Sequence, residues 1–348
     1  MMNRIAITTG YMGSGSSAVT DLIGEFNGFT ENNGDFEYIF MHCPNGIFDL
    51  EDKLLRNNNA VRSDEALRSF RNAMYELYSL RTWWPANYKE KVSPYFIKHV
   101  DDFIENLTDF ESDSCWYHQE KLPFAKKALA ITGSIARRLS NGAISPKKVL
   151  RYSPMKLSLP SEQKFYSSAK QFLNEFFTDL GINDHNLLLD QLILPFNLNR
   201  IENYFDERAM IFVVDRDPRD VFLLNKYIWL PAGNPVPFPT DVHKFCEYYS
   251  RIRECDNDVL SPSIYRLHFE DLIYNYQEMV NDLLRCLELD ISDHVLAQKK
   301  FNPDKSINNT QLFLLPHYQE EAQIIEKLIP NFLYDFPVER MPRTAESF

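Results

Sequence analysis

The stretch that decides the fold lies near the N-terminus and reads IAITTGYMGSGSSAVTDLI over residues 5–23. Its first five residues are apolar or β-branched and predict a short buried strand, while the residues after the turn have the apolar spacing of a helix. Three glycines, Gly10, Gly13 and Gly15, fall within six residues of a chain that has 11 glycines in all. A strand, a glycine turn and a helix in this order predict a cradle for an anion, because glycine lets backbone N–H groups approach a ligand at the positive end of a helix.

The turn itself supplies the groups that an anion needs. Its spacing, Gly10-x-x-x-x-Gly15, matches that of a Walker A loop, although Ser16 stands where the lysine of that loop would be. The other interpretation is a tight turn that only caps the helix, and the concentration of scarce glycine favours the anion site. We therefore predict a site for the phosphate-like part of a cofactor, formed by Gly10, Gly13, Ser14, Gly15, Ser16 and Ser17.

The rest of the chain predicts an α/β protein. Stretches of helical periodicity separate short apolar runs, which is the pattern of a largely parallel sheet with helices between its strands. Helix starts are indicated at Ser63, Ser93 and Ser161, and we expect a helical insertion at about residues 49–180. We find no interdomain linker and predict one domain over residues 1–348. The runs that predict strands are residues 5–9, 36–41, 186–190, 210–215 and 263–268.

Composition limits the classes of function. The 348 residues include 37 basic and 49 acidic side chains, and the net charge of −12 argues against nucleic acid or an anionic membrane as the main partner, while leaving room for a local basic site. The five cysteines are scattered with no Cys-x-x-Cys pair, which indicates a reducing compartment. No apolar run approaches the roughly 20 residues of a membrane helix, and no secretory signal is recognisable. We expect a cytoplasmic protein without a metal site, since no Cys/His cluster occurs.

A second segment, residues 210–221, reads MIFVVDRDPRDV and places an arginine after a buried strand. Pro218 suits the first turn of a following helix, and Arg216 would lie at the carboxyl end of the strand, where open α/β sheets bind ligands. A guanidinium there can hold a phosphate through two hydrogen bonds. The other interpretation, which stays open, is that Arg216 and Arg219 only pair with the aspartates beside them.

The glycine loop and the arginine segment together resemble the sulfotransferases that use 3′-phosphoadenosine 5′-phosphosulfate (PAPS). Residues 265–272, YRLHFEDL, and residues 301–309, FNPDKSINN, are similar to later motifs of that family in the same order. The resemblance covers roughly residues 1–40 and 186–337, while residues 49–180 match no motif that we recognise. It implies a P-loop-like, three-layer α/β sandwich with a helical insertion.

The resemblance also implies roles for residues. In this family a sulfuryl group passes from PAPS to an acceptor. Residues 14–17 would hold the 5′-phosphosulfate and Arg216 the 3′-phosphate, while Lys305 and Ser306 would lie over the nucleotide.

Two positions depart from the family's pattern. Many members have a basic residue where this chain has Gly13, so the charge on the leaving phosphate must be neutralised by other groups, with Lys305 or backbone N–H groups as candidates. The serine expected after the arginine is replaced by Leu224, with Asn225 beside it as a substitute.

Transfer to a hydroxyl needs a base that accepts its proton. Some branches of the family use a glutamate on the second strand, and here Glu37 lies within the apolar run 36–41. A carboxylate with such neighbours should have a raised pKa, unless it lies at a sheet edge and faces water, an alternative of equal weight. His42 is the other candidate base, as in other branches of the family.

Two rival functions remain. In a P-loop kinase that uses ATP and Mg²⁺, the Asp190 carboxylate at the end of the run 186–190 would help to hold the metal ion, but the loop lysine is absent. In the second, the fold only binds a nucleotide or a glycan and has no activity. We predict a sulfotransferase with PAPS as the donor and a carbohydrate, glycolipid or other small molecule as the hydroxyl acceptor, with neither a nucleic-acid partner nor a membrane span.

Overall fold

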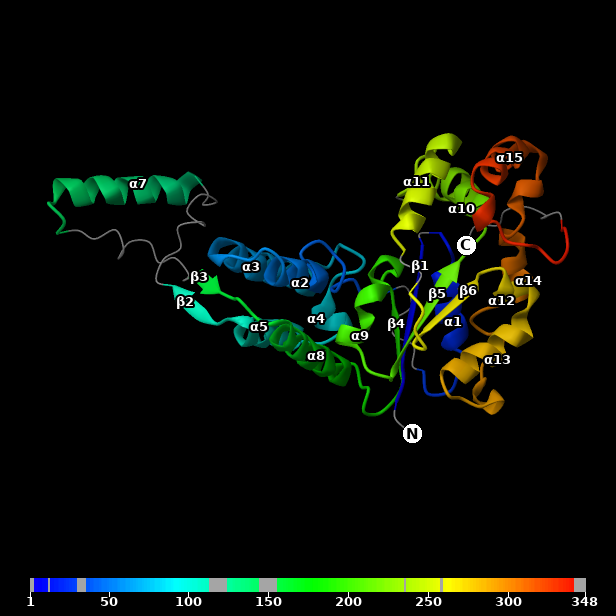
Figure 1. Ribbon diagram of the computed structural model, residues 1–348, viewed down its shortest axis with the longest axis horizontal. Coiled ribbons are helices and arrows are strands. Elements are labelled where there is room, and N and C mark those ends of the chain that lie inside the picture. Colours follow the sequence, from blue (N-terminus) through cyan, green and yellow to red (C-terminus); the bar gives the residue numbers. More distant parts are fainter. Residues whose placement is uncertain are drawn as a thin grey trace.

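The computed structural model describes residues 3–11, 13–29, 36–112, 124–143, 155–234, 236–256 and 259–340. At its centre is a four-stranded parallel sheet with the strand order β4-β1-β5-β6 (Figure 1). These strands correspond to four of the five predicted runs, so the predicted α/β class is confirmed. Their bounds are β1 (Ile5–Gly10), β4 (Leu187–Asp190), β5 (Ala209–Asp215) and β6 (Ile264–His268).

Helices cover both faces of this sheet, because alternate residues of each strand enter different cores. Ile7 and Val213 pack into a large apolar cluster that the helices of the insertion complete. Ala6 and Val214 point the other way, into a cluster formed with the two helices α1 (Ser16–Ile23) and α13 (Tyr276–Cys286). The result is the three-layer arrangement that the resemblance implied.

A third apolar cluster lies where β5 leads into its helix. It joins α10 (Pro218–Leu224), α11 (Val242–Glu254) and α15 (Gln319–Leu328), which lie together in Figure 1. Pro218 is the first residue of α10, as predicted, and the Asp217 carboxylate caps the helix by accepting a hydrogen bond from its second N–H group.

The insertion is helical, as predicted, and extends away from the sheet (Figure 1). Its interior is aromatic: the rings of Phe103 and Phe172 stack with 5.4 Å between their centroids. Residues 113–123 and 144–154 of the insertion lie outside the described part of the chain. Its helices are α2 (Ile47–Leu55), α3 (Ala60–Ser79), α4 (Tyr88–Lys91), α5 (Phe96–Leu107), α7 (Phe124–Leu139) and α8 (Glu162–Asp179).

The insertion also contains a small sheet that we did not predict. Strands β2 (Phe110–Ser112) and β3 (Met155–Leu157) pair antiparallel and bring together segments more than 40 residues apart in the chain. Each strand has three residues, which is too short for an alternating pattern to stand out in the sequence.

Of the three serines predicted to begin helices, only Ser161 is the N-cap of its helix. Ser161 caps α8 by accepting a hydrogen bond from Lys164 N–H. Ser93 forms the turn just before α5, where its hydroxyl accepts from Tyr95 N–H. The prediction at Ser63 was wrong, because the side chain of Asn59 caps α3 and the helix begins earlier, at Ala60.

The predicted strand over residues 36–41 is the main error. Only Glu37 forms a bridge, to Asp190 of β4, and the chain then turns so that Cys43 N–H donates to Ile39 O. The aromatic side chains that suggested a strand are buried against helices, and the Tyr88 hydroxyl accepts the hydrogen bond of Ile39 N–H that a strand neighbour would otherwise take. Tertiary packing has overridden β-propensity here.

Short helical turns connect the remaining elements. No described helix is both long and apolar enough to cross a bilayer. The turns are η2 (Pro195–Arg200), α9 (Ile201–Tyr204), η3 (Asn225–Trp229), α12 (Asp271–Tyr274), η4 (Ile291–Asp293), α14 (Pro303–Ser306), η5 (Ile307–Asn309), η6 (Leu312–Leu314), η7 (Pro316–Tyr318) and η8 (Pro330–Phe332).

Candidate functional site

The glycine loop between β1 and α1 has the conformation that its sequence predicted. Gly13 and Gly15 have φ of 85° and 87°, in the left-handed region that favours glycine, and Gly15 is the N-cap of α1. A Cβ atom on Gly15 would lie 2.6 Å from the Phe269 ring, and one on Gly13 would lie 2.8 Å from Nδ2 of Asn225. The loop is therefore packed closely at the N-terminus of a helix, whose first N–H groups have no partner within the helix.

Arg216 brings the second predicted segment to this loop. It follows β5 and is only 2% exposed, with Nη1 donating to Gly13 O at 3.2 Å and Nη2 donating to Asn309 O at 2.6 Å. The guanidinium carbon lies 4.3 Å from the centre of the Phe269 ring. Burial lowers the pKa of Arg216, because a charged group is costly away from water.

The two neighbouring arginines have different partners. Arg219 forms a two-point ion pair with Asp217, at 2.9 and 2.8 Å, so the interpretation as a paired cap is correct for this residue. Arg216 forms no ion pair with any described carboxylate. A buried cation that forms no ion pair is unusual in a folded protein, and it leaves room for a ligand to supply a directly bound negative charge.

Two buried carboxyl groups hold the segments around Arg216. Asp220 accepts hydrogen bonds from the N–H groups of Gln311 and Leu312, both at 2.8 Å, and Glu270 accepts one from Asp217 N–H at 3.0 Å. Burial raises the pKa of Glu270 to about 8 and also raises that of Asp220. The charges of Asp220, Glu270 and Asp217 act on Arg216 at longer range, but none of these three carboxylates forms an ion pair with it.

Buried polar atoms without partners gather at the same place. They are Ser14 Oγ, Arg216 Nε, Asn225 Oδ1 and Asn309 Oδ1, and all four residues lie beside Gly13 or hydrogen-bond to Arg216. Such atoms normally find a partner, since leaving one unpaired costs about 1–3 kcal/mol. An anion would accept from Ser14 Oγ and Arg216 Nε, and from the Asn309 amide once its oxygen and nitrogen exchange places. Asn225 keeps its orientation, because its Nδ2 already donates to Val221 O at 2.7 Å.

The other predicted residues of the loop and of the C-terminal segment have different surroundings. Ser16 Oγ accepts a hydrogen bond from Gln191 Nε2 at 2.9 Å, and Ser17 is exposed at the start of α1. Lys305 and Ser306 lie on α14, four and three residues before Asn309, respectively, and Lys305 is exposed. Their role over a nucleotide stays a prediction.

The two candidate bases lie at the end of β4, on the other side of β1. Glu37 pairs with Asp190 in a parallel bridge, and burial raises the pKa of Glu37 to about 7. The pKa of Asp190 also rises to about 7, because of its own burial and the nearby Glu37 carboxylate. His42 Nε2 lies 2.8 Å from Gln191 O, and burial lowers the pKa of its ring.

Gln191 is a site residue that we did not predict. It has a φ of 57°, its backbone oxygen contacts His42, and its side chain donates to Ser16 and accepts from Thr9 Oγ1 at 3.3 Å. It thereby joins the base candidates to the glycine loop. Its position directly after the acidic end of a predicted strand was the signal that could have found it.

No family model and no curated protein matches the chain. Among solved structures, the chain is similar to a sulfotransferase domain from the olefin synthase of Synechococcus, at 12% identity and a TM-score of 0.43, with 97% of this chain and 98% of the other covered. A sulfotransferase domain from the curacin biosynthetic pathway is 12% identical with a TM-score of 0.37 and 97% and 94% coverage.

A third similar structure is the sulfotransferase STF1 from Mycobacterium tuberculosis. It is 11% identical, with a TM-score of 0.32 and coverage of 89% of this chain and 76% of the other. Identities and TM-scores of this size assign neither a family nor an activity to the chain, so its function has to be argued from its own residues.

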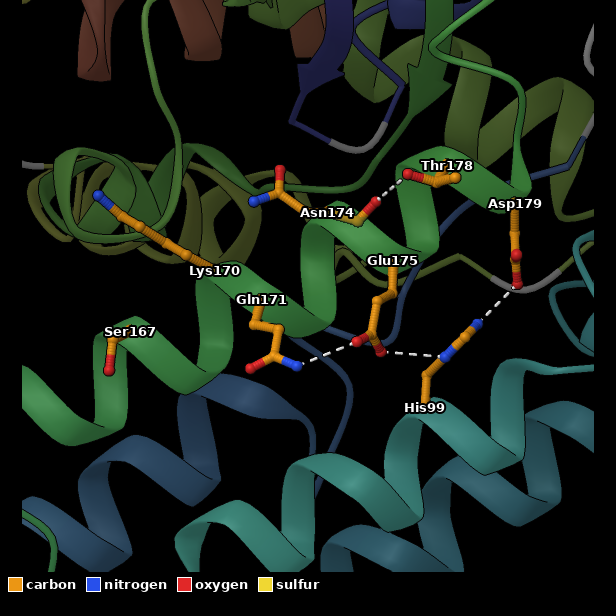
Figure 2. A pocket seen from close by; sticks show the side chains of 8 residues that line it. All are labelled: His99, Ser167, Lys170, Gln171, Asn174, Glu175, Thr178 and Asp179. Atoms are coloured by element: carbon orange, nitrogen blue, oxygen red, sulfur yellow. Dashed lines mark hydrogen bonds and ion pairs between the residues drawn. The ribbon is translucent and has the colours of Figure 1, made fainter.

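A separate cavity of about 570 Å³ lies along α8, beside α5 (Figure 2). Figure 2 shows His99 between two carboxylates, with Nδ1 3.0 Å from Glu175 Oε2 and Nε2 2.9 Å from Asp179 Oδ2. Gln171 and Ser93 donate to the same two carboxylates. These groups contact one another and lie apart from the glycine loop, and we assign the cavity no role in the candidate site. Its lining residues are His99, Ser167, Lys170, Gln171, Asn174, Glu175, Thr178 and Asp179.

Proposed function

We propose that the protein is a sulfotransferase that moves a sulfuryl group from PAPS to a hydroxyl of a carbohydrate, a glycolipid or another small acceptor. The observation that carries this proposal is the buried Arg216 without an anionic partner, in contact with a left-handed glycine loop at a helix N-terminus. PAPS has anionic groups at both ends of its ribose, which suits a site where buried donors lie beside a loop.

The residues present fit such a donor. Ser14 Oγ and the N–H groups at the start of α1 would donate to the 5′-phosphosulfate, and Arg216 Nε would donate to the 3′-phosphate. Lys305 and Ser306, on the segment that leads to Asn309, would lie over the nucleotide. The bound donor supplies the activated sulfuryl group, while binding satisfies the buried polar atoms that are unpaired in the protein alone.

Gly13 occupies the position where a basic side chain would neutralise the leaving phosphate. In our proposal the positive end of α1 and the hydroxyls of Ser16 and Ser17 perform this task. Gln191 orients the Ser16 hydroxyl, because its side-chain N–H donates to Ser16 Oγ and leaves the hydroxyl proton to point at the ligand.

Glu37 is the base in this proposal. Its pKa of about 7, raised by burial, matches the operating pH of a general base. The Glu37 carboxylate in turn helps to raise the pKa of its neighbour Asp190. The ionised Glu37 would accept the proton of the acceptor hydroxyl as the sulfuryl group transfers in line. His42, whose ring is neutral and held by the Gln191 carbonyl, is the second candidate.

Ligand-induced stabilisation tests the donor. We expect 3′-phosphoadenosine 5′-phosphate to raise the melting temperature, since a ligand at a hundredfold excess over its Kd stabilises by about 2.7 kcal/mol. Arg216→Met should remove this shift, whereas Arg251→Met, at an arginine whose side chain is 72% exposed, should keep it. Stabilisation by ATP with Mg²⁺ and not by the 3′-phosphorylated nucleotide would contradict the proposal and support a kinase.

Binding alone does not distinguish an enzyme from an inactive binding protein. Release of 3′-phosphoadenosine 5′-phosphate from PAPS should therefore be followed with and without a panel of hydroxyl acceptors. Release that depends on an acceptor supports transfer. If the protein binds 3′-phosphoadenosine 5′-phosphate but releases none of it from PAPS with any sugar, glycolipid or phenol, the protein is instead an inactive binding protein.

A further inference from the structure

Positive charge is concentrated in one segment of the insertion. Residues 121–151 contain eight basic residues and no acidic one. This leaves 29 of the 37 basic side chains for the rest of the chain, against all 49 acidic ones. The net charge of −12 thus hides a strongly basic segment in an otherwise acidic protein, and such an asymmetry is typical of contact with an anionic surface.

The helix within this segment exposes an apolar face. The large side chains of Phe124, Ile131, Ile135 and Leu139 recur along α7 at helical spacing and therefore lie on one side of it. Their exposed fractions are 87%, 61%, 52% and 83%, respectively, and the helix lies apart from the other elements in Figure 1. Four large apolar side chains that follow one helix face mark an interaction surface rather than scattered exposure.

Arg137 and Arg138 add charge to the last turn of the same helix and are both exposed. A helix with an apolar face and only basic charged residues suits the boundary between lipid headgroups and acyl chains. Its 16 residues would reach about 24 Å along the surface. A bilayer-spanning helix needs about 20 predominantly apolar residues, and α7 has 16 with arginines in its last turn, so it would lie in the surface.

We propose that α7 binds an anionic lipid bilayer by inserting this apolar face, while its basic residues contact the lipid headgroups. Charge complementarity selects an anionic partner over a neutral one. The apolar face selects a lipid surface over nucleic acid, since phosphate and base contacts would leave these four side chains in water. The inference rests on α7 and its flanking sequence and is independent of the proposed sulfuryl transfer.

Co-sedimentation of the full chain with vesicles tests the proposal. We expect binding to phosphatidylcholine vesicles that contain about one third phosphatidylglycerol and little binding to phosphatidylcholine alone. About 1 M salt should release most of the protein, since it shortens the range of the electrostatic attraction to about 3 Å. Equal binding to both kinds of vesicle, or to neither, would overturn the proposal.

Two pairs of variants separate the contributions. Ile131→Glu should reduce the binding constant at least tenfold, while Ile291→Glu should not change it; Ile291 on η4 is the matched control because it is also 61% exposed. Arg138→Gln should reduce binding about fivefold, and Arg251→Gln, on α11, should not. Circular dichroism and the melting temperature establish that each variant is folded.

The variants and a competition experiment also distinguish a lipid bilayer from other anionic partners. If Ile131→Glu and Ile291→Glu bind alike, the apolar face is not inserted and the proposal fails. If duplex DNA or a soluble acidic polypeptide such as polyglutamate removes the protein from vesicles at equal charge concentration, the attraction is electrostatic alone, and the lipid assignment is wrong.

Discussion

The sheet ends differently on the two sides of the glycine loop. After β5 there is a buried cation, Arg216, that forms no ion pair with any described carboxylate. After β4 there are two adjacent carboxyl groups, Glu37 and Asp190, for which no ion pair with a described cation is formed. The loop at the end of β1, the strand between them, separates the two groups of charge.

This difference suits the two halves of the proposed transfer reaction. Folding alone would favour pairing the opposite charges with each other, because unpaired buried charges destabilise a protein. In the proposed function, the Arg216 side of the loop binds the anionic donor and is called the donor side. The side with Glu37 and Asp190 accepts the proton and is called the acceptor side. Each of the following predictions changes one side or the loop between them.

The largest effect is expected from Glu37→Gln. Removing the base should lower the rate of sulfuryl transfer by about 10² to 10⁴-fold, while the melting-temperature shift with 3′-phosphoadenosine 5′-phosphate should persist, since the donor side is untouched. Glu202→Gln, at an exposed position on α9, is the control. An unchanged rate would exclude Glu37 as the base, and the same measurement on His42→Gln would then test the other candidate.

The two arginines of the turn after β5 should respond in opposite ways. Arg219→Met leaves the buried Asp217 carboxylate without its cation and should lower the free energy of unfolding by about 3 kcal/mol. Arg216→Met removes an unpaired buried charge and should leave the stability of the ligand-free protein within about 1 kcal/mol of the original, or above it. Urea unfolding measures both. Equal losses of unfolding free energy in the two variants would mean that Arg216 stabilises the fold, and would contradict its assignment to ligand binding.

The loop between the two sides can be tested through its glycines. Gly15→Ala and Gly142→Ala both place a Cβ at a left-handed φ, 87° and 89°, and the backbone strain should cost about 1 kcal/mol in each. Only at Gly15 would the new atom also meet the Phe269 ring, so we expect a total loss of about 2 kcal/mol there, together with weaker donor binding. Equal losses would show that the loop tolerates the close approach.

The smallest effect is a dependence of stability on pH. The pKa of Glu37 is about 7 in the folded protein against an ordinary value of 4.5, so the folded state keeps a proton that the unfolded state releases, and stability falls as pH rises through this window. Glu37→Gln lacks this titration. Between pH 5 and 7.5, the free energy of unfolding of Glu37→Gln should rise by about 1 kcal/mol relative to that of the original protein, as measured by urea unfolding. If the difference between the two free energies does not change with pH, the raised pKa of Glu37 is contradicted.

Much of the donor side could be predicted from the sequence, because it rests on local patterns. Gly13 and Gly15 adopt the left-handed backbone that a tight turn requires, and Arg216 follows its strand directly. The apolar runs that became β1 and β5 are buried on both faces, so they stand out in the sequence. Only the absence of a carboxylate partner for Arg216 had to come from the structure.

The acceptor side could be predicted only in part. Glu37 and His42 were found as candidates, but the run around Glu37 is not a strand, since its aromatic residues are buried against helices. The link through Gln191 joins residues near positions 16, 42 and 191, and no local pattern indicates which distant segments meet. The exposed face of α7 was missed for a related reason, because an amphipathic helix alone does not show whether a core covers its apolar side.

The strand order also has a consequence for how the chain folds. β1 lies between β4 and β5, whose pairing with β1 begins at Leu187 and Ala209. About 180 further residues must therefore be synthesised after Ile5 before either neighbouring strand is available. At about 5–20 residues per second that delay is roughly 10–40 s. During it, the run IAITTG has neither of the two strands with which it pairs in the folded protein. Stalling translation before residue 187 should therefore leave the N-terminal segment sensitive to protease.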